Sequence, residues 1–199
     1  MTRLVVATGN AGKLVELHEL LAGLPVELVT QSELGIADIA ETGRSFVENA
    51  LIKARHASAA SGLPALADDS GLLVDSLHGA PGLHTARFAG PQATAADNIA
   101  KLLDELRNVP EASRGAHFHC VLALLRHPED PAPLIASGSW HGRILTAPRG
   151  TGGFGYDPVF FDPTHGLSAA EMPAELKNRI SHRGRALAAL RAELEALPL

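Results

Sequence analysis

The sequence has a single cysteine, Cys120, and no apolar run that approaches the ~20 residues of a membrane-spanning helix. One cysteine excludes an internal disulfide and a cysteine-rich zinc site, and its place in an apolar run favours a buried structural thiol. The start of the chain leads straight into an alternating apolar stretch with no signal-peptide pattern. We therefore expect a cytoplasmic protein that does not associate with a membrane.

Positive charge is also scarce. The 17 lysines and arginines are outnumbered by 22 aspartates and glutamates, and the formal net charge is -5. Because a nucleic-acid backbone is held mainly by a basic surface, this balance argues against a general nucleic-acid binder. It does not exclude a small phosphorylated ligand, since a few cations gathered in one place can hold a triphosphate at any net charge.

The chain does have enough apolar sequence for a full core, because hydrophobic residues make up 46% of its 199 residues. Its first quarter predicts a buried strand at residues 3–7, a glycine turn, and a helix at residues 13–21. Ser45 and Glu48 form a capping-box pair before a second helix, which Gly62 is expected to stop.

Two apolar runs, residues 65–67 and 72–74, flank the acidic pair Asp68 and Asp69, which predicts that this pair lies at a strand end or turn. Thr94 is expected to cap a third helix. Further elements are predicted as strands at 117–125, 135–144 (antiparallel to 117–125 across a surface loop, 128–133) and 159–161, and a C-terminal helix bearing Leu187, Leu190, Leu194 and Leu197. This mixture of connections predicts an α/β fold with a mixed sheet, as one domain over residues 1–199.

The turn Thr8-Gly9-Asn10-Ala11-Gly12-Lys13 joins the first strand to the first helix. Such a turn can present backbone N–H groups and the positive end of a helix dipole to a phosphate. It is not a Walker P-loop, because Ala7 stands where that motif has its first glycine and Leu14 replaces its metal-binding Ser or Thr. The alternative is a glycine turn that only joins strand to helix. A phosphate-binding turn of this kind leaves the metal to carboxylates elsewhere.

Candidate carboxylates are Glu41, just before the capped helix, and the pair Asp68 and Asp69, which has no basic residue near it in the sequence. Such hard oxygen ligands suit Mg²⁺, which is held by one or two carboxylates plus substrate phosphates and water. The alternative is a solvated acidic turn. Because adjacent residues of an extended segment point to opposite sides, we expect only one of the two aspartates to face a site.

Two more segments carry candidate ligand contacts. Residues 152–158 place Phe154 and Tyr156 among glycines, where an aromatic ring can stack on a base; a tight turn with core aromatics is the alternative. Residues 181–184, with Lys177 four residues earlier, offer cationic donors for phosphate or base oxygens, or a basic surface.

His117, His119 and Cys120 invite comparison with a metal site. Strand alternation puts the two histidines on one face and the cysteine on the other, so we interpret them as core or surface residues. Trp140 fits a pocket or the core equally well.

Taken together, eight segments closely resemble, in order, the motifs of the inosine triphosphate pyrophosphatase family. They are residues 8–13, 41–43, 48–50, 53–54, 67–71, 79–82, 152–158 and 181–184. The resemblance runs from Leu4 to about Leu190 and favours the functional interpretation of the glycine turn, the acidic pair and the aromatic loop. It implies an elongated α/β fold of two lobes around a central mixed sheet with flanking helices, an active site in the cleft between the lobes, and a homodimer.

The resemblance also implies a role for each site residue. Glu41 and Asp69 would hold Mg²⁺, and Asp69 would also activate water. Substrate would be bound by Thr8, Gly9, Asn10, Ala11, Gly12, Lys13, Lys53, Ser70, Phe154, Gly155, Tyr156, Asp157, Lys177, His182 and Arg183. The glycine turn and Lys53 would bind the triphosphate, and the aromatic loop would surround the base and sugar. Lys177, His182 and Arg183 complete the base and phosphate contacts.

The activity implied is hydrolysis of ITP, dITP and XTP to nucleoside monophosphate and pyrophosphate, which keeps abnormal purines out of DNA and RNA. A nucleotide-binding sensor without turnover is the rival from another class. Two carboxylates near a polyphosphate argue against it, because they weaken binding unless a metal bridges them. A sugar- or monoester-phosphatase is the third interpretation, and it would not need a stacking loop.

Overall fold

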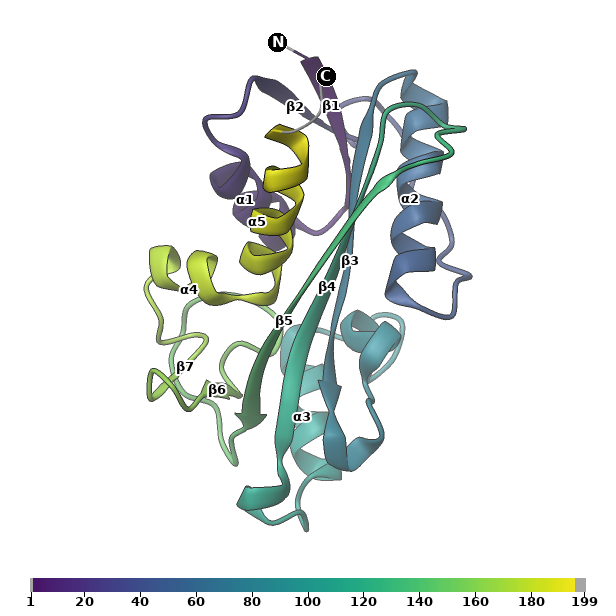
Figure 1. Cartoon of the computed structure of the whole chain (residues 1–199). Coiled ribbons are helices and arrows are strands. Elements are labelled where there is room, and N and C mark those ends of the chain that lie inside the picture. The colour runs from purple at the N-terminus through teal and green to yellow at the C-terminus, as the bar shows by residue number, and fades with distance from the viewer. Residues whose placement is uncertain (1, 196–199) are drawn as a thin grey trace. The chain divides into compact units, whose positions relative to one another are not determined.

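The computed structural model describes residues 2–195, and these form a seven-stranded sheet with the order β2-β1-β3-β4-β5-β6-β7 (Figure 1). The strands are β1 (Thr2–Ala7), β2 (Val26–Thr30), β3 (Ala65–Val74), β4 (Gly115–Leu125), β5 (Leu134–Ile144), β6 (Phe160–Asp162) and β7 (Leu167–Ser168). β1 pairs in parallel with β2 and β3, whereas β6 pairs antiparallel with β5 and β7. The predicted α/β class with a mixed sheet is confirmed.

The α-helices of the described residues are α1 (Ala11–Leu21), α2 (Phe46–Ser61), α3 (Ala95–Glu105), α4 (Ala174–Ile180) and α5 (His182–Glu195). Their predicted caps are present. Ser45 accepts a hydrogen bond from the Glu48 amide, and Gly62 ends α2 in the left-handed conformation at φ 70°. Thr94 and Asp97 form a reciprocal capping box at the start of α3. None of these helices is long and apolar enough to cross a membrane.

The acidic pair does not lie at a strand end or turn, so that prediction is wrong. β3 continues through Asp68 and Asp69 as one strand of 10 residues. A polar interruption ends a strand when its side chains need water, but both aspartates are buried against cations supplied by other elements. The strand therefore keeps its backbone pairing through the polar residues.

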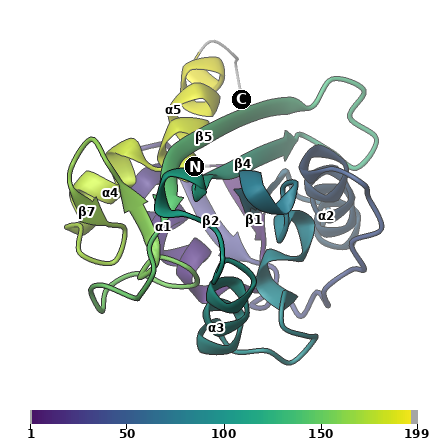
Figure 2. The same cartoon turned by 90° about the horizontal axis from the view of Figure 1, so that it is seen from below.

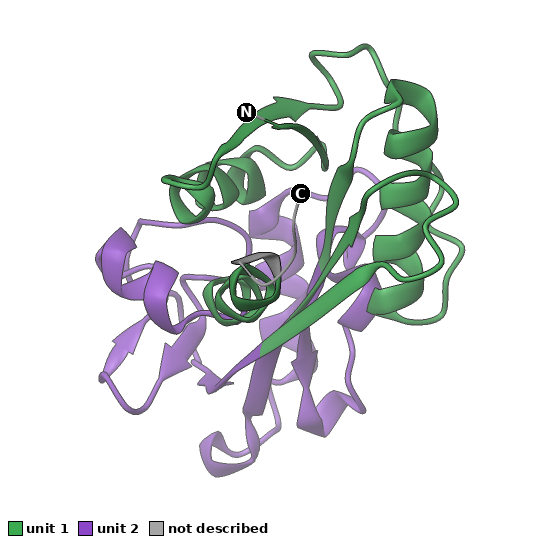
Figure 3. Ribbon diagram, turned by 45° about the horizontal axis from the view of Figure 1, so that its top comes forward, with its two compact units in different colours: residues 1–69, 120–138, 183–199 green, residues 70–119, 139–182 purple. Residues whose placement is uncertain are grey.

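The chain divides into two compact units (Figure 3). Unit 1 comprises residues 1–69, 120–138 and 183–199, and unit 2 comprises residues 70–119 and 139–182. The chain passes from one unit to the other within β3, within β4, within β5 and after the first residue of α5. The single domain expected over residues 1–199 stays a prediction.

Unit 1 has an apolar layer on each face of its strands. Alternation along β1 sends Leu4 and Val6 to the layer that contains α1 and α5, and Val5 and Ala7 to the layer that contains α2. Figures 1 and 2 show α1 and α5 on one side of these strands and α2 on the other. Of the predicted stripe of the C-terminal helix, Leu187 and Leu190 are in this core; Leu197 and the side chain of Leu194 lie outside the described residues.

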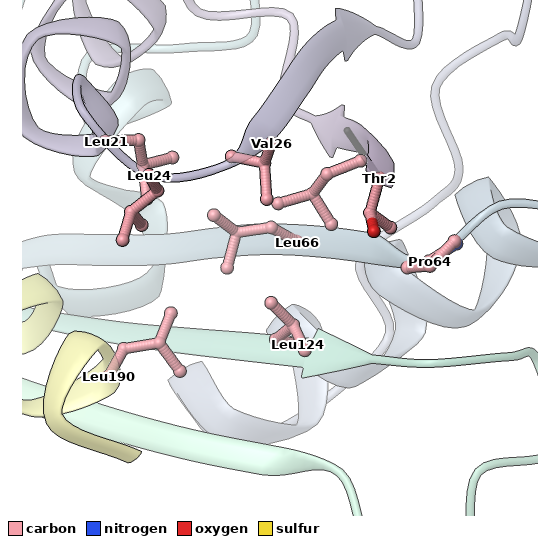
Figure 4. Close-up of a pocket in the computed structure, with 9 residues that line it drawn as sticks. Thr2, Leu21, Leu24, Val26, Pro64, Leu66, Leu124 and Leu190 are labelled. Carbon is pink, nitrogen blue, oxygen red and sulfur yellow. The ribbon is translucent and has the colours of Figure 1, made fainter. Parts of the chain in front are cut away.

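The layer of α1 and α5 encloses a small cavity of ≈ 20 Å³ (Figure 4). Its lining comprises Thr2, Leu4, Leu21, Leu24, Val26, Pro64, Leu66, Leu124 and Leu190. Because these residues carry no charge, the cavity is a packing feature of the core and not a place for a phosphate.

Unit 2 has its own core around α3. Leu102 and Leu106 pack with Leu72 and Val74 of β3 and with the aromatic residues of β4, β5 and β6. Trp140, which the sequence left open, is 1% exposed, and its indole N–H donates to Asp162 at 3.0 Å. It is therefore a core residue with a satisfied polar atom.

Candidate active site

The glycine turn leads from β1 into α1. Asn10 is the N-cap of α1, and its side-chain oxygen accepts from the Lys13 amide at 3.1 Å, while its own amide donates to the Thr8 hydroxyl at 3.2 Å. The cap fixes the first helical turn, where backbone N–H groups without helical partners point along the axis. The local geometry is thus that of an anion-binding helix start.

Asp68 is the centre of a buried ionic network in unit 1. Its two carboxylate oxygens bind different cations: Oδ1 lies 2.5 Å from the Lys13 ammonium and Oδ2 accepts from Arg183 Nε at 2.7 Å. Arg183 is 1% exposed and also pairs with Glu16 of α1. Burial alone raises the pKa of Asp68, but the charges of Arg183 and Lys13 outweigh it and hold that pKa well below its ordinary value.

The thiol of Cys120 also belongs to this network. It donates to Asp68 Oδ2 at 3.2 Å, and burial raises the pKa of the thiol well above its ordinary value. Cys120 is therefore a neutral buried group, as its apolar sequence context predicts.

Asp69 belongs to a second network of unit 1. The Lys53 ammonium, from α2, donates to Asp69 Oδ1 at 2.8 Å, to Glu41 Oε1 at 2.9 Å and to the Asp68 carbonyl oxygen at 2.8 Å. Burial raises the pKa of Asp69, because it outweighs the opposing effect of Lys53. The two adjacent aspartates thus send their side chains to different partners, as strand alternation predicts.

This second network has the donor chemistry of a magnesium site. Glu41 and Asp69 direct two carboxylate oxygens at one cation, and the Asp68 carbonyl adds a third hard oxygen. No group of three or more His, Cys, Asp or Glu residues in residues 2–195 is arranged to hold a metal. Two carboxylates are what Mg²⁺ needs when phosphate and water supply its other ligands, so the residues present fit this ion.

Unit 2 brings together the residues of the predicted aromatic loop. Asp157 Oδ2 accepts from the Lys177 ammonium at 2.6 Å and from the Phe154 amide at 2.8 Å, and that ammonium lies 4.9 Å from the centre of the Phe154 ring. A side chain at Gly153 would place its Cβ 2.0 Å from the same carboxylate oxygen, so this turn requires glycine.

The two aromatics of this loop differ in role. Tyr156 is buried in the core, its hydroxyl donates to the Thr85 carbonyl oxygen at 2.9 Å, and burial raises its pKa. Phe154 is only partly buried. The alternative of core aromatics therefore holds for Tyr156, and Phe154 has the accessible ring.

Two further predicted contacts are His182 and Ser70, each next in sequence to a member of an ionic network. His182 packs its ring on Phe118, with centroids 4.8 Å apart and planes 14° from parallel. Ser70 lies in β3 and is half-buried. His117 stacks on His141, and His119 Nδ1 lies 2.8 Å from the Ser139 hydroxyl, so neither histidine joins a metal cluster in the described part of the chain.

Sequence reasoning missed Glu16, the fourth charged member of the Asp68 network. The available signal was its position three residues after Lys13, on the same side of α1. A buried acid on an otherwise apolar helix side needs a cation, but the sequence does not say that Arg183 supplies it.

Comparison with known proteins shows which proteins this chain resembles over its length. The sequence profile of the Ham1 family matches residues 4–193. A dITP/XTP pyrophosphatase of Xanthomonas oryzae pv. oryzae is 65% identical over 199 residues, which cover 100% of both chains. One of Shigella flexneri is 56% identical over 187 residues, 94% of this chain and 95% of that protein. The structure of a HAM1 protein from Coxiella burnetii is similar over 99% of this chain and 100% of that one, with 50% identity and a TM-score of 0.92.

Proposed function

Because the chain belongs to the Ham1 family, we propose that it is a dITP/XTP pyrophosphatase, a hydrolase that converts non-standard purine nucleoside triphosphates, ITP among them, to monophosphate and pyrophosphate. The observation that carries the proposal is the pair of networks on β3. One contains a cation of the glycine turn, Lys13, and the other gathers carboxylate oxygens that suit a metal. Such an enzyme keeps abnormal purines out of DNA and RNA.

In the proposed mechanism, the start of α1 binds the phosphates. Its free amides and the Lys13 ammonium attract the negative phosphate oxygens, which orients the triphosphate for attack. Asp68 holds Lys13 from the buried side. That contact limits the number of positions the lysine side chain adopts and reduces the entropy lost when it binds phosphate.

In the hydrolytic step, Asp69 is the proposed proton acceptor. Burial raises the pKa of this carboxyl above its ordinary value, which makes the ionised form a better proton acceptor for an attacking water. Glu41 and Asp69 would hold Mg²⁺, which neutralises charge that develops on the phosphate oxygens. Attack at the α-phosphorus follows from the family resemblance, and it predicts pyrophosphate as the leaving group.

Base selection falls to unit 2 and the start of α5. Phe154 offers a ring face to a purine, and His182, Arg183 and loop amides are the proposed donors to the oxygen at position 6 of hypoxanthine or xanthine. Adenine places a donor at position 6 and an acceptor at position 1. A pocket that donates to position 6 therefore leaves buried groups unpaired when adenine binds.

A substrate panel with separate phosphate and pyrophosphate readouts tests the proposal. We expect kcat/KM for dITP, ITP and XTP to exceed that for ATP by about 10⁴-fold, with pyrophosphate as the product. GTP should also be poor, an expectation that rests on the resemblance because guanine shares the position-6 oxygen. Release of orthophosphate without pyrophosphate would identify a phosphatase, and tight binding without turnover would identify a sensor.

The homodimer and the nucleotide cleft between two lobes follow from the resemblance, and the cytoplasmic location follows from the sequence; all three stay predictions. Sedimentation equilibrium tests the dimer directly, since the mass of one chain is 20.8 kDa.

A further inference from the structure

Lys53 has two roles that it cannot fill at the same time. An ammonium has three N–H donors, and those of Lys53 are directed at Glu41, Asp69 and the Asp68 carbonyl. To bind a triphosphate, as the proposed function requires, it must release at least one of these oxygens. To bind a divalent cation, the carboxylates must likewise release the lysine.

We propose that Lys53 is a resident cation that occupies the position of the metal in the metal-free protein, and that a divalent cation displaces it and thereby frees it for the phosphates. The inference rests on the proposed function for the identity of the metal ligands. No covalent bond changes in the exchange: the lysine keeps its proton, and the carboxylates exchange one positive partner for another.

Charge and burial support the exchange. The side chains of Lys53 and Asp69 are 15% and 9% exposed. Without a cation beside them, the charged carboxylates of Glu41 and Asp69 would therefore have a large desolvation penalty. One lysine leaves the Glu41 and Asp69 pair with a net negative charge, whereas a divalent cation neutralises it. The two carboxylates therefore attract a divalent cation more strongly than they attract the lysine ammonium.

The chain connection adds a second reason. Glu41 lies in a segment without helix or strand, between β2 and α2, and Lys53 ties it to β3. Without any cation, repulsion from Asp69 would push Glu41 away from the strand. In the absence of metal, Lys53 therefore keeps Glu41 close to Asp69.

Metal affinity without nucleotide is the first test, with Mn²⁺ as the probe and electron paramagnetic resonance as the readout. If Lys53 occupies the site more than about 90% of the time, Lys53→Met should tighten Mn²⁺ binding about tenfold or more, because the competitor is gone. The matched control is Lys13→Met, which removes an equal charge that acts on Asp69 without a hydrogen bond to it. It should tighten binding by less than about threefold.

If Lys53→Met and Lys13→Met tightened Mn²⁺ binding equally, loss of a nearby positive charge would explain both results. That outcome would overturn the proposal. So would an absence of Mn²⁺ binding to both wild type and Lys53→Met at millimolar metal. The double variant Lys53→Met/Asp69→Asn should lose the gained affinity, which assigns the binding to these carboxylates.

Nitrogen NMR tests the exchange on the wild-type protein itself, with variants needed only to assign the signals. The sequence has four lysines, Lys13, Lys53, Lys101 and Lys177, so their side-chain ¹⁵N signals can be assigned by single substitutions. Saturating Mg²⁺ should shift the Lys53 signal and leave that of Lys101, which pairs with Glu105, unchanged. A Lys53 signal that stays in place would overturn the exchange.

Failure of this inference and failure of the proposed function give different results. An enzyme that hydrolyses dITP while the Lys53 signal ignores Mg²⁺ keeps its function and refutes the exchange. A protein that exchanges Lys53 for the metal but hydrolyses no nucleotide keeps the exchange and refutes the function.

Discussion

The two units carry their candidate site residues in contrasting environments. In unit 1, the strand β3 places two adjacent aspartates in two ionic networks that together contain seven charged side chains: Lys13, Glu16, Glu41, Lys53, Asp68, Asp69 and Arg183. In unit 2, the candidate residues include a buried ion pair, Lys177 with Asp157, and aromatic rings.

The contrast between ionic networks in unit 1 and aromatic rings in unit 2 fits two different parts of the proposed substrate. Burying charge is costly unless opposite charges and hydrogen bonds compensate it, and the proposed function assigns the paired charges of unit 1 to the triphosphate and the metal. An aromatic ring beside a single ion pair suits a flat and nearly neutral group such as a purine base. Substitutions in unit 1 should therefore alter turnover and stability, and substitutions in unit 2 should alter base preference.

Asp69→Asn should have the largest effect on activity. The amide keeps the shape of the side chain but loses the charge that attracts a metal and accepts a proton, so kcat should fall by at least 10²- to 10⁴-fold. The fold should survive, as measured by thermal unfolding. Asp104→Asn, on the exposed surface of α3, is the matched control and should leave both quantities unchanged. Turnover within tenfold of wild type would refute the role of Asp69.

Asp68→Asn should show the opposite balance, with a milder loss of activity and a larger loss of stability. Asp68 pairs with both Lys13 and the buried Arg183 guanidinium, and removing one partner of a buried ion pair costs about 3–5 kcal/mol. Urea unfolding at neutral pH measures this cost. A loss below about 1 kcal/mol would mean that Glu16 alone compensates Arg183.

The pH dependence of unfolding sharpens that comparison. The pKa of Asp68 is lower in the folded protein than in the unfolded chain, so its ion pairs stabilise the fold above the unfolded pKa of ~3.9. This contribution is lost as the pH falls from there toward the folded pKa. Wild type should therefore lose stability more steeply below about pH 4 than Asp68→Asn does. Parallel curves would place the acid-sensitive group elsewhere.

The sequence predicted elements whose signals are local. The starts of α2 and α3 were correct because an N-cap is a contact between residues three apart, and Gly62 marks a left-handed position that few other residues adopt. The buried strand predicted at residues 3–7 is likewise confirmed by β1. The interruption of β3 was predicted wrongly because the cations that neutralise Asp68 and Asp69 are distant in the sequence.

The same limit applies to the candidate site. A list of charged residues does not say which ones pair, so the division into an Asp68 network and an Asp69 network required the structure. Nor did the loop sequence distinguish the buried Tyr156 from the partly exposed Phe154. Both distinctions depend on contacts between distant elements, which the family resemblance implies only as a set of roles.

Lys13→Ala should have a smaller effect than either aspartate substitution. A charge-assisted hydrogen bond to phosphate contributes about 1.5–3 kcal/mol, so the inhibition constant of a triphosphate analogue should rise roughly ten- to hundredfold. The monophosphate product should be affected less, because it lacks the β- and γ-phosphates. Lys53→Ala should show the same preference. Equal losses for both ligands would place these lysines away from the terminal phosphates.

The smallest effects should come from the aromatic loop of unit 2, where two neighbouring positions separate binding from stability. Phe154→Leu removes a partly exposed ring and should raise KM for dITP about fivefold, since stacking contributes about 1–3 kcal/mol per base and leucine retains part of the contact. Its unfolding temperature should change little. Tyr156→Phe removes the hydroxyl that donates to the Thr85 carbonyl, so it should cost about 1 kcal/mol of stability and leave KM unchanged. Steady-state kinetics and urea unfolding on both variants decide the matter. If Tyr156→Phe raised KM while Phe154→Leu did not, the base would be bound at the tyrosine, and the division between an ionic unit 1 and an aromatic unit 2 would need a different contact residue.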